Sequence, residues 1–539
     1  MATREYDVCI IGSGAAGGVM AKELCEGGAK VLMLEAGQRV APAQFLSHTW
    51  PYSLPYRGLR GEKQALFYPP DIARVRYESS DPVSVDRIRV LGGRTLHWNA
   101  VTLRYAARDF QPYSAEGIDE DWPLSYAEME PYYDRIEQTI GVCGQDDHLE
   151  ILPAGRHYLP AIPWRCSEHL LHRATRSMGI PLIAVRKAVL TRPYDNRPPC
   201  HYCGHCMTGC DAEAIFTSPD CMLPKARATG NFTLRQNAIA RELLVNREGR
   251  VSGVAWVDRR TKKEDVARAR IFVVCAATVE SARLLLNSRS PLFPDGLANG
   301  NGMVGRYLHG HSGGTLYIYL KELEGVKPFN QDGATDHVYI PRYNQLFGRP
   351  AYSGGWGIQV NFASYMFPLQ AHRIRGYGAD YKRQVRALQP GFLHLGSFAK
   401  ILARPENYVG VDPHRTDEFG IPVPVVHFRF AGNDYALWQD LKRSLLEIAG
   451  HLRGATVFPQ FGRTPGGFGS HEVGTIRMGR DPKTSVLNAW CQAREVKNLF
   501  VTDGSCFTSC SEKNPTLTIM ALSLRAAGYI REQRRRGEL

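Results

Sequence analysis

Four cysteines fall inside eleven residues and could bind a metal. Cys200, Cys203, Cys206 and Cys210 follow a C-x2-C-x2-C-x3-C spacing, which is that of a ferredoxin-type iron–sulfur loop. The proline that follows the last ferredoxin cysteine is absent, because Asp211 stands there. Zinc is the competing metal, although structural zinc sites usually pair two short knuckles across a longer spacer. The spacing therefore favours an iron–sulfur cluster over zinc, and either of them over no metal.

A G-x-G-x-x-G turn near the N-terminus has the composition of a dinucleotide-binding site. Gly12 permits a tight turn, Gly14 lets a pyrophosphate approach the backbone, and Gly17 allows close packing of helix on sheet. The N-terminus of the following helix faces the negative charge of the pyrophosphate. Glu35 ends the next strand, where it is placed to bind the ribose hydroxyls of the adenosine. The turn alone does not separate FAD from NAD.

These residues need strands and helices to position them, and the sequence supplies both. A helix is expected over residues 15–26, directly after the turn, and a C-terminal helix over 517–532. A region rich in aromatics, Gly and Pro, 311–460, has the short alternating runs of a mostly antiparallel sheet. Buried strands of the parallel-sheet type are expected over residues 6–11, 31–34, 271–275 and 499–503. We therefore predict an α/β protein of at least two domains.

The charge of the chain excludes little by itself. Its net charge is +13, from 66 Lys and Arg against 53 Asp and Glu, but the positive residues are scattered. The one dense run, Arg534 to Arg536, has the pattern of a solvated tail. We expect no nucleic-acid partner, and a basic zinc-binding module that contacts nucleic acid remains the alternative from another class. No apolar run is long enough to cross a bilayer, and no signal peptide is evident, so export would need a partner subunit that carries the signal.

Together with the glycine-rich turn, four further segments resemble the glucose–methanol–choline (GMC) oxidoreductase family. LGGRTLHWN resembles the Gly-Gly loop that lies along the flavin, and CAATVESARLL resembles the second family signature. GSHEVGTIRMG matches the H-x-x-G-T-x-R-M-G motif, and DGS followed by NPTLT matches the C-terminal block. The four segments begin at residues 91, 275, 469 and 503, and the second part of the last one begins at residue 514. The matches follow the family order and span nearly the whole chain.

The resemblance implies a fold that the local patterns do not give. It implies a Rossmann-like FAD-binding domain of the GMC type, assembled from separated stretches, with a discontinuous antiparallel-sheet substrate domain between them. The FAD-binding domain is expected over residues 1–40, 85–110, 230–310 and 460–539. The substrate domain and its lid are expected over residues 41–84, 111–229 and 311–459, including the Cys-rich loop 200–210.

The resemblance also implies which residues contact the FAD. Besides Gly12, Gly14, Gly17 and Glu35, the positions expected to bind the cofactor are Gly93, Arg94, Thr95, His97, Asn99, Ala238, Ala276, Asp503 and Thr516. The spacing of His97 after the two glycines resembles that of sugar oxidases of the family in which the matching histidine is bonded to the flavin. We expect noncovalent FAD here, with His97 close to the ring.

Oxidation of an alcohol by a flavin needs a hydride acceptor and a base for the hydroxyl proton. A neutral histidine suits the second task near neutral pH. His471 occupies the position of the family's catalytic base, and Asn514 fills the place of its partner. An asparagine binds the substrate oxygen but does not titrate, so the proton transfer is assigned to His471 alone.

A subset of the family combines this pair with a cysteine loop. The His–Asn pair and the loop look most like the FAD-containing catalytic subunit of bacterial glucoside 3-dehydrogenases. Cys200, Cys206 and Cys210 resemble the three ligands of a 3Fe–4S cluster. If Cys203 is a fourth ligand, the cluster would be 4Fe–4S. The resemblance implies a small accessory subunit that carries the export signal and a cytochrome that accepts the electrons. The protein would then face the periplasm, and otherwise the cytoplasm.

The sequence therefore predicts an FAD- and iron–sulfur-dependent dehydrogenase. Its substrate would be a sugar or glycoside, which it would oxidise at the secondary hydroxyl on C3 to give a 3-keto product. The alternative is an oxidase of the pyranose-oxidase or C-glycoside-oxidase type that produces hydrogen peroxide and has a structural metal at the Cys-rich loop.

Overall fold

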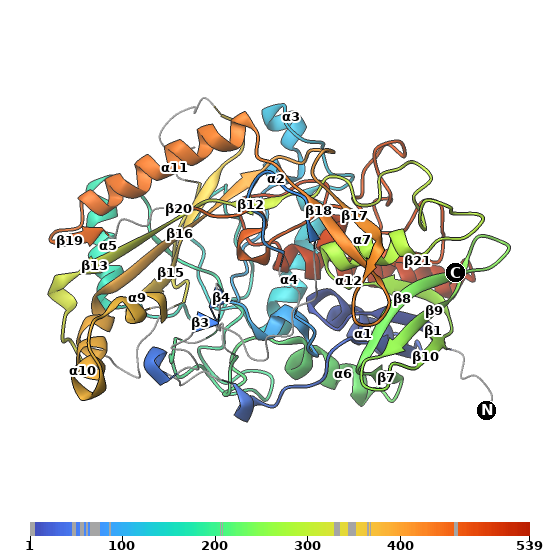
Figure 1. Cartoon of the computed structure of the whole chain (residues 1–539), viewed down its shortest axis with the longest axis horizontal. Helices are drawn as coiled ribbons and strands as arrows, with labels where there is room; N and C mark the ends of the chain where they lie inside the picture. Colours follow the sequence, from blue (N-terminus) through green and yellow to red (C-terminus); the bar gives the residue numbers. More distant parts are fainter. Residues whose placement is uncertain are drawn as a thin grey trace.

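The computed structural model describes residues 6–45, 50–53, 59–60, 63–64, 76–85, 88–204, 206, 209–327, 335–342, 352–363, 366, 368–457 and 462–539. Two regions lie side by side in Figure 1, one built on a parallel sheet and one on an antiparallel sheet. Much of the predicted lid, 41–84, falls outside the described residues. The domain boundaries given above stay a prediction.

The parallel sheet has the order β21-β11-β1-β2-β7 in the described chain. Every neighbouring pair in it is parallel, and the strands are apolar because both faces of the sheet are covered. Its members are β1 (Tyr6–Ile11), β2 (Val31–Leu34), β7 (Phe232–Arg235), β11 (Ala269–Val274) and β21 (Leu499–Val501). The predicted buried strands are confirmed, and widely separated parts of the sequence form one sheet.

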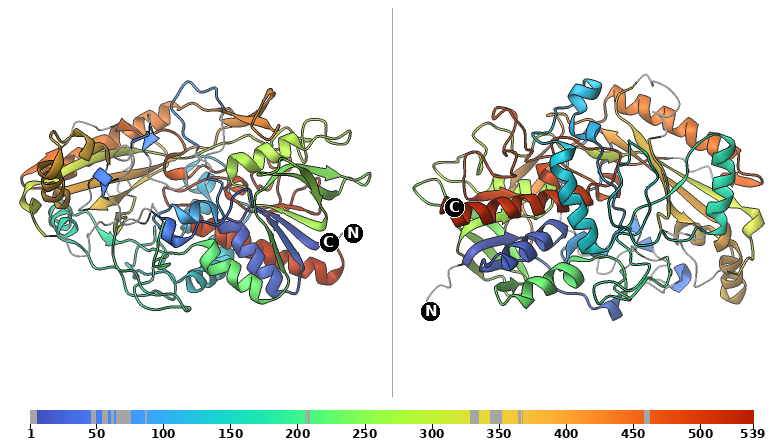
Figure 2. Two further views of the ribbon diagram at one scale, coloured as in Figure 1. Left: turned by 60° about the horizontal axis from the view of Figure 1, so that its bottom comes forward. Right: turned by 180° about the vertical axis from the view of Figure 1, so that it is seen from behind.

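Helices cover one face of this sheet. α1 (Ala15–Glu26) packs against α12 (Thr516–Arg536) and α6 (Leu223–Ala228), as Figure 2 shows. α12 in turn packs against α4 (Tyr126–Ile140), whose first turn is closed by a capping box of Ser125 and Glu128. The helices predicted after the turn and at the C-terminus are confirmed.

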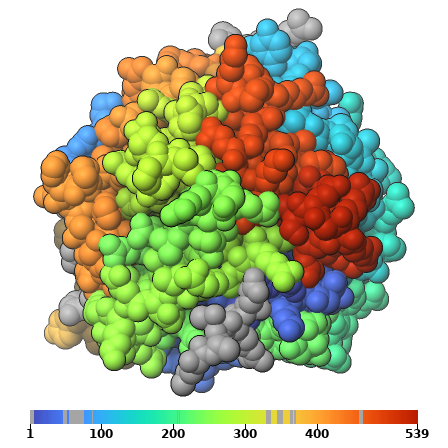
Figure 3. All heavy atoms as spheres, turned by 90° about the vertical axis from the view of Figure 1, so that its right-hand side faces the viewer, coloured from blue at the N-terminus to red at the C-terminus, as the bar shows by residue number. Residues whose placement is uncertain are grey.

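A small antiparallel sheet adjoins the parallel one. It consists of β8 (Ala238–Val245), β9 (Val251–Asp258) and β10 (Glu264–Ala267), with a turn between β8 and β9 that Gly249 permits at a φ of +73°. In the space-filling view of this end of the molecule, these green residues share a face with the red C-terminal residues (Figure 3).

The second region is an antiparallel sheet with the order β19-β13-β16-β15-β14-β6 in the described residues, and β12 and β20 pair with β16 and β13. Helix α11 (Gly432–Gly450) packs on β13 and β16 with a stripe of buried leucines. The strands are β6 (Ile183–Ala184), β12 (Gly310–Ser312), β13 (Gly314–Leu320), β14 (Val338–Ile340), β15 (Trp356–Ala363), β16 (Phe392–Ile401), β19 (Ala455–Val457) and β20 (Gly462–Arg463). The predicted antiparallel sheet in 311–460 is confirmed.

A third layer joins the two regions. β17 (Tyr408–Thr416) and β18 (Pro422–His427) form an antiparallel pair that packs on α7 (Thr278–Asn287), and β5 (Arg76–Tyr77) extends it. Besides short 3-10 and π-helical turns, the other described elements are β3 (Leu59–Arg60), β4 (Lys63–Gln64), α2 (Ala107–Phe110), α3 (Pro112–Glu116), α5 (Cys166–Ser177), α9 (Pro368–Arg373) and α10 (Gly378–Leu388). Within the described chain, none of the helices combines the length and the apolar composition that a bilayer span requires.

The glycine-rich turn is held by close contacts that only glycine allows. Gly12 has a φ of +101°, and a Cβ on it would lie 2.3 Å from the Cys275 carbonyl oxygen. A Cβ on Gly17 would lie 2.0 Å from the Gly12 carbonyl oxygen. The turn therefore sits directly against the end of β11, as the tight turn and close helix packing predicted from the sequence require.

We predict that Gly12→Ala destabilises the protein, because the new methyl group meets backbone atoms that cannot move aside. The free energy of unfolding should fall by about 2 kcal/mol or more. Gly528→Ala is the matched control, because Gly528 lies in α12 with no described atom within 4 Å of its would-be Cβ. That change should raise the free energy by about 0.5–1 kcal/mol. Urea titration measures both, and equal effects of the two variants would contradict the explanation.

Candidate active site

His471 and His311 form a pair at the boundary of the two sheets. His471 follows the short helical turn Phe468–Ser470, and His311 lies in β12. Their Nδ1 atoms are 2.8 Å apart, and the rings cross at 85°. The Nε2 of His311 lies 2.6 Å from the Ser511 carbonyl oxygen. His311 was not among the residues predicted from the sequence.

The Ser511 carbonyl determines which ring nitrogens carry protons. A carbonyl oxygen only accepts hydrogen bonds, so His311 donates from Nε2, and the Nδ1 of neutral His311 is an acceptor. His471 therefore donates from its Nδ1 to His311. The Nε2 of His471 is left with a lone pair, which is the form that a general base requires. This assignment follows from the hydrogen-bond network.

Asn514 lies on the other side of His471. Its Nδ2 is 3.3 Å from the His471 Nε2, and its Oδ1 accepts a hydrogen bond of 2.6 Å from Gln359 Nε2. Because the His471 Nε2 is an acceptor, the Asn514 amide is oriented with its NH2 group toward it. The predicted pair is thus brought together, and Gln359 of β15 is a further residue that the sequence did not indicate.

Burial keeps both histidines neutral at physiological pH. It lowers the pKa of His471 well below its usual value, and the nearby imidazole of His311 and guanidinium of Arg94 lower this pKa further. Burial also lowers the pKa of His311 to about 4, against an opposing effect of the Ser511 carbonyl. The His471 lone pair is therefore available at neutral pH and below.

An ion pair links the Gly-Gly loop to Glu472, the residue that follows His471. Arg94 lies in the short helix η4 (Gly93–Leu96), and its Nη2 is 2.5 Å from the Glu472 Oε1. The Nη1 of Arg94 also donates to the Ser470 carbonyl. The residues on both sides of His471 are thereby fixed to the loop that is expected to contact the flavin.

The glycine-rich turn leaves room for a pyrophosphate. No described heavy atom lies within 4 Å of a would-be Cβ on Gly14, and on Gly93 the nearest is the Gly14 Cα at 3.9 Å. The first turn of α1 has no acidic residue and no side-chain cap among the described residues. The Ser13 hydroxyl donates to Glu35 and accepts from the Gly92 amide, at 2.5 and 2.8 Å. An open cradle at a free helix N-terminus fits the pyrophosphate of FAD.

The other positions predicted to contact FAD lie beside strands and helices of the parallel-sheet region and the small sheet that adjoins it. Glu35 is buried at the end of β2 and also accepts from the Gly37 amide at 2.7 Å. Asp503 follows β21 and accepts hydrogen bonds from the Ala277 amide and from Ser281 and Ser505. Ala238 begins β8, Ala276 follows β11, and Thr516 begins α12. All of these positions lie at the ends of the elements that form the dinucleotide-binding region.

The Gly-Gly loop continues through three more predicted residues. Thr95 accepts a hydrogen bond from the Ser218 amide at 3.1 Å. His97 is buried, and Asn99 donates from its Nδ2 to Asp336. Whether His97 bonds to the flavin stays a prediction.

Three cysteines of the Cys-rich loop, Cys200, Cys206 and Cys210, lie near one another. Cys203 is buried and the other three are partly buried, and all four are free thiols. Burial raises the pKa of Cys200 to about 11 and that of Cys210 to about 12, and the nearby Cys206 adds to both shifts. Residues 205, 207 and 208 of the loop lie outside the described residues. In the part that is described, no three His, Cys, Asp or Glu side chains are arranged to hold a metal ion, so metal binding by this loop stays a prediction.

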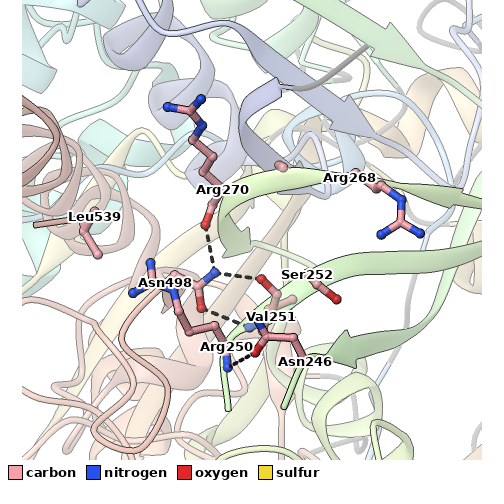
Figure 4. A pocket seen from close by; sticks show the side chains of 9 residues that line it. Asn246, Arg250, Val251, Ser252, Arg268, Arg270, Asn498 and Leu539 are labelled. Atoms are coloured by element: carbon pink, nitrogen blue, oxygen red, sulfur yellow. Dashed lines mark hydrogen bonds between the residues drawn. The ribbon is translucent and has the colours of Figure 1, made fainter. Parts of the chain in front are cut away.

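A pocket of about 440 Å³ lies elsewhere, at the amino end of β11. Figure 4 shows it between the turn after β8 and the C-terminal residues, with Asn498 bonded to backbone atoms of Val251 and Arg270. The Arg268 and Arg270 side chains point away from each other. Ligands of such sheets bind at the carboxyl ends of the strands, so this pocket is separate from the active site.

The fold and the site define a flavoprotein that oxidises alcohols, and comparison with known families agrees. Models of GMC oxidoreductases match residues 6–312 and 403–523. The chain belongs to the GMC oxidoreductases, enzymes that act on CH–OH groups and for which FAD is the expected cofactor.

Individual relatives cover nearly the whole chain. It is 30% identical to a 2-methyl-1,2-propanediol dehydrogenase of Mycolicibacterium austroafricanum, over 98% of this chain and 95% of the relative. It is 26% identical to the fructose dehydrogenase large subunit of Gluconobacter japonicus, over 99% of both chains. The crystal structure of pyridoxine 4-oxidase from Mesorbium loti has the same fold, with a TM-score of 0.65, 18% identity and coverage of 98% of this chain and 99% of that one.

We predict that the pH dependence of kcat/KM reports the lowered pKa of His471. The base acts in its neutral form, so activity is lost as the pH falls through its pKa, and this limb should lie well below pH 6.5. Arg94→Gln removes a positive charge near His471, which raises that pKa and moves the limb to higher pH.

Arg383→Gln is the control for this shift, because Arg383 pairs with Asp380 on the exposed surface of α10. Rates should be expressed per bound FAD, so that a loss of cofactor in the Arg94 variant does not distort the comparison. An acid limb that stays in place, or moves to lower pH, in Arg94→Gln would contradict the electrostatic role of this guanidinium.

Proposed function

We propose that this GMC oxidoreductase is a dehydrogenase that oxidises a secondary hydroxyl of a sugar or glycoside, at C3, to a ketone. The observation that carries the proposal is the hydrogen-bond chain that leaves a lone pair on His471 Nε2 beside the NH2 group of Asn514. A sugar as substrate is supported by the full-length similarity to the fructose dehydrogenase large subunit.

The two side chains divide the work on the substrate hydroxyl. His471 Nε2 accepts the hydroxyl proton, and the Asn514 Nδ2 donates a hydrogen bond to the same oxygen. As negative charge develops on this oxygen, the Asn514 bond strengthens, while a neutral amide neither takes nor gives a proton. FAD, when bound along the cradle of Gly14 and Gly93, supplies the acceptor for the hydride that leaves the alcohol carbon.

We propose further that the Cys-rich loop holds an iron–sulfur cluster, 3Fe–4S with Cys200, Cys206 and Cys210 as ligands. The proposal is supported by the cysteine spacing and by the nearness of these three thiols in the fold. Such a cluster, when bound, supplies one-electron carriage between the flavin and an external acceptor. A cytochrome as acceptor, a small signal-bearing subunit and a location facing the periplasm belong to the same proposal, and the large-subunit relative supports a multi-subunit enzyme.

The substrate proposal predicts turnover of methyl glucosides with an artificial acceptor in the absence of oxygen. A 3-keto product should appear in the NMR spectrum of the reaction, and one acceptor equivalent should be reduced per electron removed. Methyl 3-deoxyglucoside, which lacks the reacting hydroxyl, is the matched control and should not be oxidised. Turnover of simple alcohols without turnover of any glycoside would refute the substrate class. In a parallel reaction in air without the artificial acceptor, peroxide formation equal to substrate loss would favour an oxidase.

The cluster proposal predicts about three iron atoms per FAD in protein purified without oxygen. Cys206→Ser should lose the iron and its EPR signal while retaining the flavin absorbance. Cys203→Ser should keep both if the cluster is 3Fe–4S, and should lose the iron if it is 4Fe–4S. Cys166→Ser is the control, because Cys166 is exposed and lies outside the loop. Bound zinc, or no metal, in the wild-type protein would refute the proposal.

A further inference from the structure

A fully buried ionic cluster lies directly behind the two catalytic residues. It consists of Asp109, Arg342, Glu512 and Lys513, whose side chains are at most 5% exposed. Lys513 Nζ is 2.9 Å from both Asp109 Oδ2 and Glu512 Oε1, and Arg342 Nε is 2.7 Å from Glu512 Oε2. Arg342 also donates to Asp109 from Nη2. Two cations and two carboxylates thus form a ring, and Glu116 adds a longer contact of 3.7 Å to Arg342.

The ring ties together three distant parts of the chain. Asp109 belongs to α2, Arg342 follows β14, and Glu512 and Lys513 precede α12. The Arg342 backbone has a φ of +33°, which non-glycine residues rarely adopt. A side chain held in such a backbone conformation is one that its surroundings fix firmly.

Burial of these charged groups opposes folding, because each loses its hydration, whereas apolar side chains at the same positions would not carry this desolvation cost. Burial acts against both carboxylates, yet the two cations hold the pKa values of Asp109 and Glu512 below their usual range. Both carboxylates are therefore ionised at neutral pH. Replacing such a cluster by apolar residues is often neutral or stabilising, so fold stability alone does not explain why charges stand here.

The ring holds the residues that set the direction of the catalytic hydrogen bonds. Ser511 donates from its hydroxyl to Glu512 at 2.7 Å and accepts from Lys513 at 3.2 Å, while its carbonyl accepts from His311. Asn514 follows Lys513 directly in the chain. The Ser511 residue is thus anchored to the cluster through its side chain, and the backbone of Asn514 through the adjacent Lys513, while Gln359 holds the Asn514 amide.

We propose that Asp109, Arg342, Glu512 and Lys513 are positioning residues that fix the tautomer of His471 through the Ser511 carbonyl and the Asn514 amide. With the ring intact, the Ser511 carbonyl stays in line with His311 Nε2, and the lone pair of His471 stays on Nε2. With the ring broken, the segment from Ser511 to Asn514 shifts, and part of the protein holds His471 with its proton on Nε2, which cannot act as a base. The proposal rests on alcohol oxidation with His471 as base, and on neither the identity of the sugar nor the iron–sulfur cluster.

The test compares FAD-loaded full-length variants. The double variant Glu512→Gln/Lys513→Met removes one charge of each sign and leaves Asp109 and Arg342 as a balanced pair. Its kcat should fall at least about ten-fold with KM changed less than about two-fold, because an incorrect tautomer reduces the active fraction and not substrate binding. His311→Phe, which removes a link of the chain itself, sets the size of the full effect.

Histidine ¹⁵N spectra read the tautomer without any turnover. In the wild type, His471, identified by the signals lost in His471→Asn, should show a protonated Nδ1 and an unprotonated Nε2, and the double variant should show a mixture. The single variant Lys513→Arg keeps the positive charge and should retain the wild-type pattern of histidine signals. Because the spectra need no substrate, the absence of glycoside oxidation would refute the proposed substrate and leave this test intact.

Glu137→Gln is the matched control. Glu137 is a residue of α4, is as buried as Glu512, and pairs with Arg104. This pair is separate from the segment of Ser511 to Asn514. The control variant should lower the melting temperature as the cluster variants do, with kcat and the His471 signals unchanged. If the double variant does not fold, Asp109→Asn replaces it. A folded cluster variant with the wild-type tautomer and kcat would overturn the proposal, as would an equal loss of kcat in Glu137→Gln.

Discussion

A backbone carbonyl accepts hydrogen bonds and never donates them, and the active site depends on this asymmetry at Ser511. From that one atom the direction of each bond follows in turn, through His311, His471 and Asn514 to Gln359. Imidazole and amide groups can exchange the positions of donor and acceptor. Here they adopt a single arrangement because the Ser511 carbonyl, at one end of the hydrogen-bond chain, can only accept. The reactivity of His471 is therefore a property of the fold as much as of the imidazole.

The fold brings this chain of bonds to the cofactor region by joining separate sheets. His311 and Gln359 come from the antiparallel sheet, whereas Asn514 precedes the helix that packs on the dinucleotide-binding helix α1. Arg94 then connects the Gly-Gly loop to Glu472, beside His471. The residues proposed to accept the proton and those expected to bind the cofactor thus come from different regions that meet at His471. If the two regions moved relative to each other, His471 would lose its fixed position beside the cofactor-binding loop. The buried ionic cluster pairs Arg342, which follows β14 of the antiparallel sheet, with Glu512, which precedes α12.

Features that depend on a local pattern or a short motif could be predicted from the sequence. The turn at Gly12, its flanking strands and helices, and the His471–Asn514 pair could all be predicted. His311 could not, because His309 stands two residues before it and only the pairing of β12 with β16 places one of them against His471. Gln359 likewise depends on the register of β15. The charged residues of the ionic cluster resemble surface residues in the sequence, since their burial results from contacts between distant segments.

The order of strands in the parallel sheet also has a consequence for how the protein is made. β1 and β2 are synthesised first, but β11 gains its second neighbour only when β21, at residues 499–501, has been translated. Helix α12 and Asn514 follow later still. Until then the nascent chain exposes a strongly apolar strand edge, which is prone to misassociation. Completion of the sheet and the addition of Asn514 therefore come close together at the end of synthesis.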